Sequence, residues 1–239
     1  MRLNRILLFI VIFSLLGAAV NGCDKAQAAH HPAADSAGDD SDFLDVLTFL
    51  GDSTTAHMQQ RSKLRVDQIW AAKNRYLNLD SRVTYAKIIA PDTGQEQTIA
   101  EVAQRLSPKY LVITLGVDYG VYYYRDEPQT FAHYYEKLLS AISNASESTT
   151  LILQSIFPVG RNAVAITNQM IQSANDVIRG IAFKRGLVFV DQTPVLSDAE
   201  GYLKPEYCYS EDGIHLTASA YDAILKHIVT MEAEIRGRV

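Results

Sequence analysis

The sequence predicts an α/β domain in which a parallel sheet is covered by helices on both faces. Short apolar runs alternate along the chain with longer segments that carry apolar residues at helical spacing. The run at 110–115, YLVITL, has no polar alternation, which is typical of a central parallel strand buried on both faces. The composition, 48% hydrophobic and 21% charged, indicates a globular protein with a substantial core.

The amino-terminal half of this domain is predicted to contain three strands and two helices. Residues 46–50 form a short apolar run that ends at Gly51, which predicts the first strand, and a helix is predicted over 54–61. A second strand is predicted at 84–89 and a helix at 98–106, ending before Pro108. The strand at 110–115 follows. Because functional sites in parallel sheets lie at the carboxyl ends of strands, Ser53 falls where a site is expected.

The carboxyl-terminal half continues the alternation. A helix is predicted over 128–145 because its apolar residues recur on one side: Phe131, Tyr134, Tyr135, Leu138, Leu139 and Ile142. A buried strand follows at 151–157, then a helix at 168–185 that ends at Gly186, and a last strand at 187–190. The closing helix is predicted over 217–236, with Thr217 as its cap.

The first 22 residues differ from the rest of the chain. Arg2 and Arg5 precede an uncharged run at 6–20, which is short for a membrane span and suits a signal-peptide core. The run leads to Val-Asn-Gly-Cys at 20–23, which resembles a bacterial lipoprotein signal in which Cys23 becomes lipid-modified. An uncleaved anchor helix is the alternative. Either way, we expect the protein to be extracytoplasmic and membrane-tethered, with a flexible linker at 23–42 and the domain at 43–239.

Charge and cysteine content exclude several classes. Cleavage before Cys23 removes two of 22 basic residues and none of 27 acidic ones, leaving 20 minus 27, or −7. An acidic domain is not expected to bind nucleic acid. With Cys208 the only other cysteine, no disulfide framework is predicted. The histidines show no metal-ligand spacing, so we expect no metal or other cofactor. A two-lobed solute-binding lipoprotein would need more residues.

Two motifs carry the predicted chemistry: Gly-Asp-Ser at 51–53 and Asp-Gly-Ile-His at 212–215. A serine becomes a useful nucleophile when a histidine takes its proton and a carboxylate orients that histidine. Asp212 and His215 lie three residues apart, and Gly213 allows a tight turn between them. Taken singly, Ser53 could equally serve as a helix cap, and His215 could equally be a surface histidine. Both motifs together favour catalysis.

These motifs, with GVDYG at 116–120 and LQSIFPVG at 153–160, resemble the SGNH (GDSL-type) hydrolases over about 45–228. The resemblance implies a flavodoxin-like three-layer α/β/α sandwich. It implies Ser53 as nucleophile, His215 as general base and Asp212 as the residue that orients His215. The implied activity is that of a serine esterase or acylhydrolase, and O-acetyl groups on glycans are one expected substrate. A catalytically weak or inactive glycan- or partner-binding lipoprotein is the alternative.

The family also implies an oxyanion hole, built from the backbone of the nucleophile, a glycine amide and an asparagine side chain. The asparagine belongs to the third motif segment of the family, which here is Gly116-Val117-Asp118 and which we call the third block. Asp118 stands where the asparagine is expected, and an ionised carboxylate only accepts hydrogen bonds. Arg75 stands at the expected glycine. Asp118 protonated by burial, Asp118 paired with Arg75, and an impaired enzyme all remain open. Asn74 or the Arg75 guanidinium are candidate replacement donors.

The substrate is less sharply indicated. Four tyrosines follow the third block closely: Tyr119, Tyr122, Tyr123 and Tyr124. Such side chains stack on sugar rings or pack against neighbouring helices, and the sequence leaves both readings open. An ester-bearing small molecule or glycan is the expected partner. The sequence does not indicate an oligomeric state.

Overall fold

A parallel sheet of five strands organises the fold. The computed structural model describes residues 40–117, 119–209 and 211–238. The strands are β1 (Leu47–Gly51), β2 (Ile69–Trp70), β5 (Tyr110–Thr114), β6 (Thr150–Gln154) and β7 (Val188–Val190). They are ordered β2-β1-β5-β6-β7, and every neighbouring pair is parallel. This is the strand order of flavodoxin-like sheets, so the predicted fold class is confirmed.

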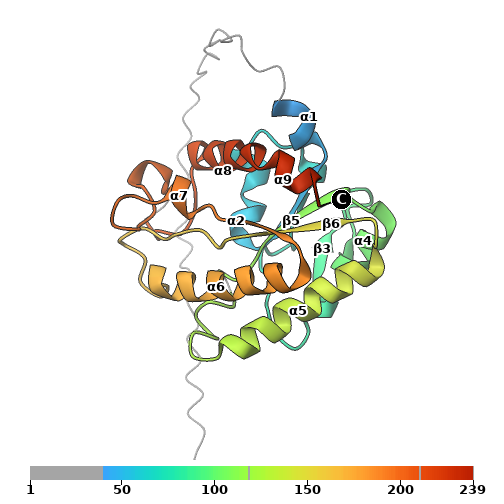
Figure 1. The fold of residues 1–239 in the computed structure, drawn as a ribbon, viewed down its shortest axis with the longest axis horizontal. Helices are drawn as coiled ribbons and strands as arrows, with labels where there is room; N and C mark the ends of the chain where they lie inside the picture. Colours follow the sequence, from blue (N-terminus) through green and yellow to red (C-terminus); the bar gives the residue numbers. More distant parts are fainter. Residues whose placement is uncertain (1–39, 118, 210, 239) are drawn as a thin grey trace, which may run out of the picture. The chain divides into compact units, whose positions relative to one another are not determined.

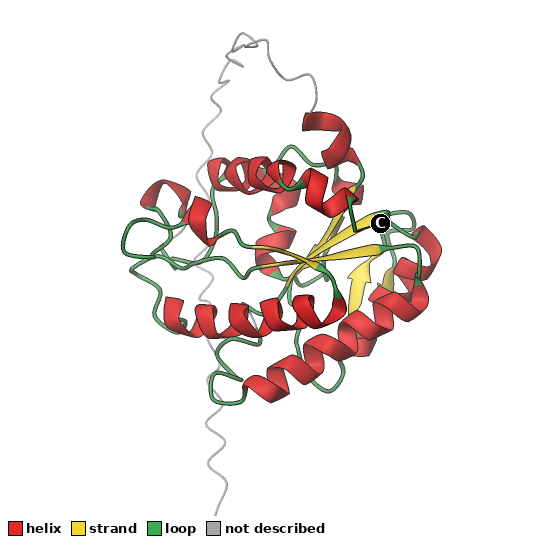
Figure 2. Ribbon diagram, in the orientation of Figure 1, coloured by secondary structure: helices red, strands yellow, loops and turns green. Residues whose placement is uncertain are grey.

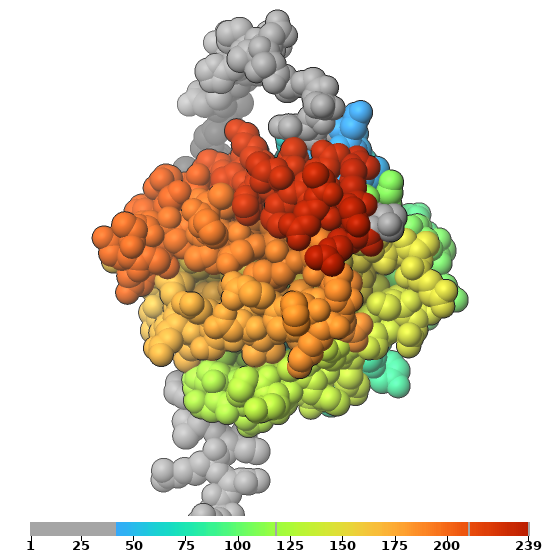
Figure 3. Space-filling model, in the orientation of Figure 1, coloured from blue at the N-terminus to red at the C-terminus, as the bar shows by residue number. Residues whose placement is uncertain are grey.

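Helices cover both faces of the sheet, as Figures 1 and 2 show. On one face α4 (Ile99–Leu106), α5 (Pro128–Ala145) and α6 (Asn168–Arg185) pack on Leu111 and Ile113 of β5. On the other, α1 (Asp40–Asp45), α7 (Thr193–Leu196), α8 (Ala218–Thr230) and α9 (Glu232–Arg236) pack with Tyr110 and Val112 of the same strand. Consecutive residues of β5 thus serve opposite faces, as expected for a strand. Segments of α5, α6 and α8 cover most of the face seen in Figure 3.

The long helices match their predicted bounds because their sequences carry explicit end signals. Helix α5 begins at Pro128, and α6 ends at Gly186 in a left-handed conformation. Helix α4 is capped by Thr98, which forms a reciprocal capping box with Glu101. Thr217 caps α8 by accepting a hydrogen bond from the Ala220 N–H, as predicted. Tyr134 is only partly buried, unlike the rest of its predicted face.

Three predicted elements were wrong in detail. The helix predicted at 54–61 begins at Ser53 and divides into α2 (Ser53–Ala56) and α3 (Met58–Arg61). The closing helix divides at Met231 into α8 and α9. The strand predicted at 84–89 does not join the main sheet: a 3-10 turn (Val83–Tyr85) precedes β3 (Lys87–Ile89), which pairs antiparallel with β4 (Glu96–Thr98). The remaining strands end within three residues of prediction.

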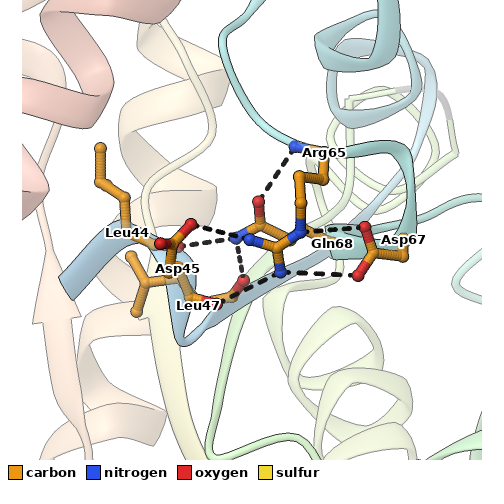
Figure 4. Close-up of polar contacts among 6 residues, drawn as sticks. All are labelled: Leu44, Asp45, Leu47, Arg65, Asp67 and Gln68. Atoms are coloured by element: carbon orange, nitrogen blue, oxygen red, sulfur yellow. Dashed lines mark hydrogen bonds and ion pairs between the residues drawn. The ribbon is translucent and has the colours of Figure 1, made fainter. Parts of the chain in front are cut away.

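The edge strand β2, which the sequence analysis missed, is held to β1 by a buried amide. The Gln68 side chain, 4% exposed, donates to the carbonyls of Leu44 (2.6 Å) and Leu47 (2.8 Å). Figure 4 shows this amide between α1 and the turn before β2, beside Arg65, which pairs with Asp45 at 2.7 Å. These contacts satisfy carbonyls at the end of α1 and fix the start of β2.

The amino-terminal predictions fall largely outside the described residues. The signal segment, Cys23 and most of the linker lie among the residues that are not described. Helix α1 begins at Asp40, within the predicted linker, and its Phe43 and Leu44 are buried against the domain. No helix in the described part of the chain is long and apolar enough to cross a membrane.

Candidate active site

Ser53 lies at the carboxyl edge of the sheet, where β1 gives way to α2. It is the first residue of α2 and is 8% exposed. Gly51, the last residue of β1, lies so close to its neighbours that an added Cβ would be 2.1 Å from Thr55 Oγ1 and 2.2 Å from the Thr114 carbonyl. Only glycine therefore allows β1 to end against β5 with Ser53 at this edge.

Asp52 ties the segment that bears Ser53 to the loop that follows β5. Its carboxylate is 1% exposed. Oδ2 accepts the backbone N–H groups of Gly116 (3.1 Å) and Val117 (3.0 Å), and Oδ1 accepts the Thr54 hydroxyl at 3.1 Å. Charge-assisted hydrogen bonds of this kind are about twice as strong as neutral ones. The carboxylate therefore fixes the loop that leads towards position 118.

Asp212 and His215 form a hydrogen-bonded pair within one turn. Asp212 Oδ1 accepts the backbone N–H groups of Ile214 (2.7 Å) and His215 (3.2 Å), while Oδ2 lies 2.6 Å from His215 Nδ1. Because a carboxylate accepts, Nδ1 is the donor, and Nε2 is left as the basic nitrogen of a neutral ring. Gly213 adopts φ +72°, as the tight turn requires.

The loop that carries this pair is held from three sides. Its Gly213 carbonyl accepts the Gly160 N–H at 2.7 Å, and Asn162 donates to the Glu211 carbonyl. The Arg61 guanidinium donates to the Leu216 carbonyl at 3.1 Å, and its central carbon lies 3.4 Å from the centre of the Tyr209 ring. These contacts limit the positions available to His215.

Helix α2 and the His215 loop meet. The His57 N–H donates to the Ser53 carbonyl at 3.0 Å, so His57 lies about one helical turn beyond Ser53. The His57 ring centre is 4.5 Å from that of His215. The Tyr221 hydroxyl, from α8, donates to the Thr54 carbonyl at 2.6 Å. The structure thus brings the segments of Ser53 and His215 together, although they lie at opposite ends of the domain sequence.

His57 is held neutral at this edge. Partial burial is the main cause that lowers the pKa of His57 from 6.5 to about 4; His215 when protonated, Arg61 and Arg75 lower it further, and Asp212 opposes them. Its Nε2 lies 3.1 Å from Arg75 Nη1. Because arginine only donates, Nε2 accepts and the ring proton is on Nδ1. That Nδ1 is buried and has no hydrogen-bond partner among the described residues.

The residues predicted to stabilise an oxyanion are only partly available. The Gly116 N–H donates to Asp52, and the Arg75 N–H donates to the Ala72 carbonyl at 2.8 Å. Asn74 is exposed, and its side-chain oxygen accepts the Tyr76 N–H at 3.1 Å. Asp118 lies outside the described residues. Of this set, the Arg75 guanidinium is the group that approaches His215, through His57.

The tyrosines after the third block divide into two kinds. Tyr124 is partly buried, packs against Tyr134 of α5, and has a pKa raised to about 12, mainly by burial. Tyr122 and Tyr123 are 44% and 54% exposed, and the Tyr119 ring stacks on Tyr123 with centres 4.0 Å apart. Packing therefore accounts for Tyr124, and the exposed pair remains available to a ligand.

A hollow of about 730 Å³ lies beside the loop that carries Arg75. Asn74 and Tyr76 line it from that loop, and Tyr85 lines it from the next turn. Tyr76 and Tyr85 are 59% and 74% exposed. Within the part of the chain that is described, no group of three His, Cys, Asp or Glu side chains is arranged to hold a metal.

The sequence analysis missed three residues at this edge: Asp52, His57 and Arg61. Asp52 stands in the Gly-Asp-Ser triplet, which the analysis used only for its serine. His57 follows Ser53 by four residues in a predicted helix, and this spacing was the available signal. Arg61 had no local signal, because its contacts with Leu216 and Tyr209 arise only from the fold.

Comparison with known proteins supports the fold and identifies a family. The model of the GDSL-like lipase/acylhydrolase family matches residues 49–223. A GDSL-like lipase from Bacteroides thetaiotaomicron is 17% identical, with 83% of this chain and 91% of that chain covered and a TM-score of 0.50. A proposed acylhydrolase from Bacteroides fragilis is 16% identical, with coverage of 81% and 88% and a TM-score of 0.51. No curated protein matches the chain.

Proposed function

The chain belongs to the GDSL-like lipase/acylhydrolase family and is a carboxylic ester hydrolase, and from this premise we propose that Ser53, His215 and Asp212 are its catalytic triad. The observation that carries the proposal is the 2.6 Å contact between His215 Nδ1 and Asp212 Oδ2. This contact belongs to a loop whose histidine packs on His57, about one helical turn from Ser53.

In the acylation step, Ser53 Oγ attacks the ester carbonyl carbon while His215 Nε2 takes the serine proton. Asp212 holds the proton of the imidazole on Nδ1, which keeps Nε2 basic, and it stabilises the imidazolium that forms. The tetrahedral intermediate then collapses. The carbon–oxygen bond to the alcohol breaks, and His215 returns the proton to the departing alkoxide, leaving Ser53 acylated.

In the deacylation step, water replaces the alcohol. His215 Nε2 takes one proton of the water as its oxygen attacks the acyl carbon, and returns it to Ser53 Oγ as the acid departs. Ser53 and His215 return to their starting states after the two steps. Every atom of the ester and the water is therefore recovered in the acid and the alcohol. A serine mechanism of this kind requires no metal or cofactor.

Kinetics on a small aryl ester test the triad. With 4-nitrophenyl acetate, we expect Ser53→Ala and His215→Gln to lower kcat by about 10³-fold or more, since a triad acts as a unit. Lys226→Gln, an exposed change on α8, serves as the matched control. Turnover in Ser53→Ala equal to the wild type would show that another group attacks the ester.

We propose further that the ester is an O-acetyl group on a glycan. The exposed rings of Tyr122 and Tyr123 lie a few residues after the third block, and Tyr76 and Tyr85 line the hollow beside the Arg75 loop. Flat aromatic faces with polar edges suit sugar rings.

An acetylated sugar tests this substrate class. Tyr123→Ala is expected to raise KM for an acetylated xylooligosaccharide about tenfold and to change KM for 4-nitrophenyl acetate much less, because the small ester has no sugar ring to stack. Phe183→Ala is the control. This side chain is 88% exposed, but it lies near the end of α6, which leads to the amino edge of the sheet. An unchanged KM in Tyr123→Ala contradicts the glycan proposal.

For localisation, we propose that the enzyme is extracytoplasmic and anchored to the cell membrane through lipid on Cys23. The proposal rests on the sequence of the first 23 residues. Detergent partitioning of the protein expressed in a bacterium, compared with Cys23→Ser, tests it. Release of the substituted protein into the aqueous phase is expected. Equal partitioning of both proteins would instead indicate an uncleaved anchor helix.

A further inference from the structure

Arg75 has an unusual backbone for its residue type. Its φ is +67°, and among the described residues only Ser107 is another non-glycine residue with positive φ. Ser107 has an ordinary explanation, because it is the left-handed cap that ends α4. Arg75 ends no helix but closes a turn, in which its N–H donates to the Ala72 carbonyl at 2.8 Å. A turn that continues in this conformation usually has glycine there, because a Cβ is disfavoured, and non-glycine residues with positive φ are enriched at functional sites.

The Arg75 side chain is held by a neutral group. Other arginines, such as Arg105, Arg161 and Arg185, pair with carboxylates. For Arg75, no carboxylate of a described residue lies within ion-pair distance, and its Nη1 donates to His57 Nε2 at 3.1 Å. Because the pKa of His57 is lowered to about 4, that ring adds no charge near neutral pH. The contact fixes the direction of the guanidinium, and the neutral His57 ring does not compensate the positive charge of Arg75.

This cation lies beside the candidate catalytic histidine. The ring that holds Arg75 is 4.5 Å, centre to centre, from the ring of His215. Arg75 is exposed, and the contact with His57 uses one of five guanidinium N–H groups. The remaining donors form a planar fork, which matches the paired oxygens of a carboxylate or phosphate.

Two carboxylates at this edge of the sheet are already hydrogen-bonded to other groups. Asp212 is hydrogen-bonded to His215, and Asp52 is buried beneath the loop after β5. Arg61 lies close enough, with Arg75, to lower the pKa of His57. The protein as a whole carries a net charge of −5, so the guanidinium groups of Arg75 and Arg61 offer an anion a local attraction that the overall charge does not.

We propose that Arg75 determines specificity by binding a carboxylate or phosphate of the ester substrate, and that His57 is the positioning residue that holds it there. The substrate class is then an acyl ester on an acidic carrier, such as an O-acetyl group on an acidic sugar. This inference rests on the proposed function of Ser53 and His215.

Two aryl acetates that differ by one carboxylate test the role of Arg75: 4-nitrophenyl acetate and 5-acetoxy-2-nitrobenzoate. The measured quantity is the ratio of kcat/KM for the charged ester to that for the neutral one. We expect Arg75→Gly to lower this ratio about tenfold, mainly through KM of the charged ester, as for the loss of a charge-assisted contact. Glycine tolerates φ +67°, so Tm should not fall. Arg105→Gln, which removes an equal charge near the amino edge of the sheet, should leave the ratio unchanged.

Three results would overturn the inference. An unchanged ratio in Arg75→Gly means that Arg75 does not contact the anion. An equal loss on both esters means that the guanidinium acts at the oxyanion instead. A ratio that rises about tenfold in Asp118→Asn and becomes sensitive to Arg75 only in that background means that Asp118 neutralises Arg75 in the wild type.

The positioning role of His57 has its own readout. His57→Gln retains an acceptor for the Arg75 N–H, so we expect it to keep most of the charged-ester preference, whereas His57→Leu should lose it. Equal preference in the two variants contradicts a positioning role. A merely structural role would lower Tm in His57→Leu without moving the ratio of the two esters.

Competition identifies the anion and separates this inference from the proposed function. Glucuronate and glucose 6-phosphate are compared with glucose as inhibitors of 4-nitrophenyl acetate hydrolysis. If only glucuronate competes, the site binds a carboxylate. If only glucose 6-phosphate competes, it binds a phosphate. If neither competes, the anion site is overturned. If the wild type hydrolyses neither ester, the proposed function fails. Calorimetric binding of the same anions to the wild type but not to Arg75→Gly then still supports the anion site, and equal binding overturns it.

Discussion

Asp52→Asn tests how the segment of Ser53 is connected to the loop after β5. The carboxylate accepts two buried backbone N–H groups, from Gly116 and Val117, through a single oxygen. Hydrogen bonds to a charged group contribute about 1.5–3 kcal/mol each, and neutral ones about 0.5–1.5. Removing the charge therefore lowers each bond by about 1 kcal/mol. The Thr54 hydroxyl can rotate to accept from the new amide, so that contact is nearly conserved.

We therefore expect Asp52→Asn to lower the free energy of unfolding by about 1–2 kcal/mol, since relief from burying a carboxylate offsets part of the loss. Asp52→Ala leaves two buried N–H groups without an acceptor, at about 1–3 kcal/mol each, and is expected to be the more destabilising. Urea denaturation measures both changes. Asp92→Asn is the control, because its carboxylate is paired with Arg105 at the surface, where such a pair contributes little to stability.

The same substitution should affect turnover. Because the loop after β5 leads to position 118, its displacement is expected to lower kcat on 4-nitrophenyl acetate about tenfold or more. If Asp52→Asn is as stable as the wild type and turns over at the same rate, the carboxylate does not hold the loop. Equal destabilisation by asparagine and alanine would likewise refute the reasoning, because only alanine removes the acceptor.

Three further predictions concern the groups around Ser53. Asp212→Asn should lower kcat about 10³–10⁴-fold, because an amide no longer fixes the proton on His215 Nδ1; kinetics on 4-nitrophenyl acetate measure this, and a change below tenfold contradicts it. The folded chain resists protonation of His57 down to pH about 4, while the unfolded chain binds that proton near 6.5, so stability is lost as pH falls through this window. After a discount for partial exposure the loss is about 1–2 kcal/mol, and urea denaturation of His57→Gln at pH 8 and pH 5 should show a smaller loss than the wild type. Asp118→Asn should raise kcat about tenfold or more if position 118 faces the oxyanion, and unchanged turnover excludes that position.

Much of the fold could be predicted because its signals are local. Helix α5 starts at Pro128, α6 is capped by Thr167 and ends at Gly186, and both have apolar periodicity, so their bounds were predicted correctly. Strand β2 has only two residues, too few for a periodic pattern, and is defined by its pairing with β1. The segment at 87–89 has strand character, but its choice of partner, 96–98 rather than the main sheet, is a tertiary outcome.

The candidate site could be predicted where one motif contains both partners. Asp212 and His215 lie in one turn, so their contact follows from spacing. The availability of backbone donors could not be predicted. The Gly116 N–H is bound by Asp52 and the Arg75 N–H by Ala72, and each depends on loop conformation. The contact of His57 with His215 joins distant segments and has no sequence signal of its own.

The central claim is that Ser53 is a nucleophile activated by His215. The most direct measurement is covalent labelling with a fluorophosphonate, followed by mass spectrometry of the intact protein and its peptides. We predict one adduct per chain, located on Ser53. In His215→Gln, the labelling rate should fall by about 10²-fold or more. No adduct at high probe concentration with the folded protein, or an adduct on another residue, would contradict the claim.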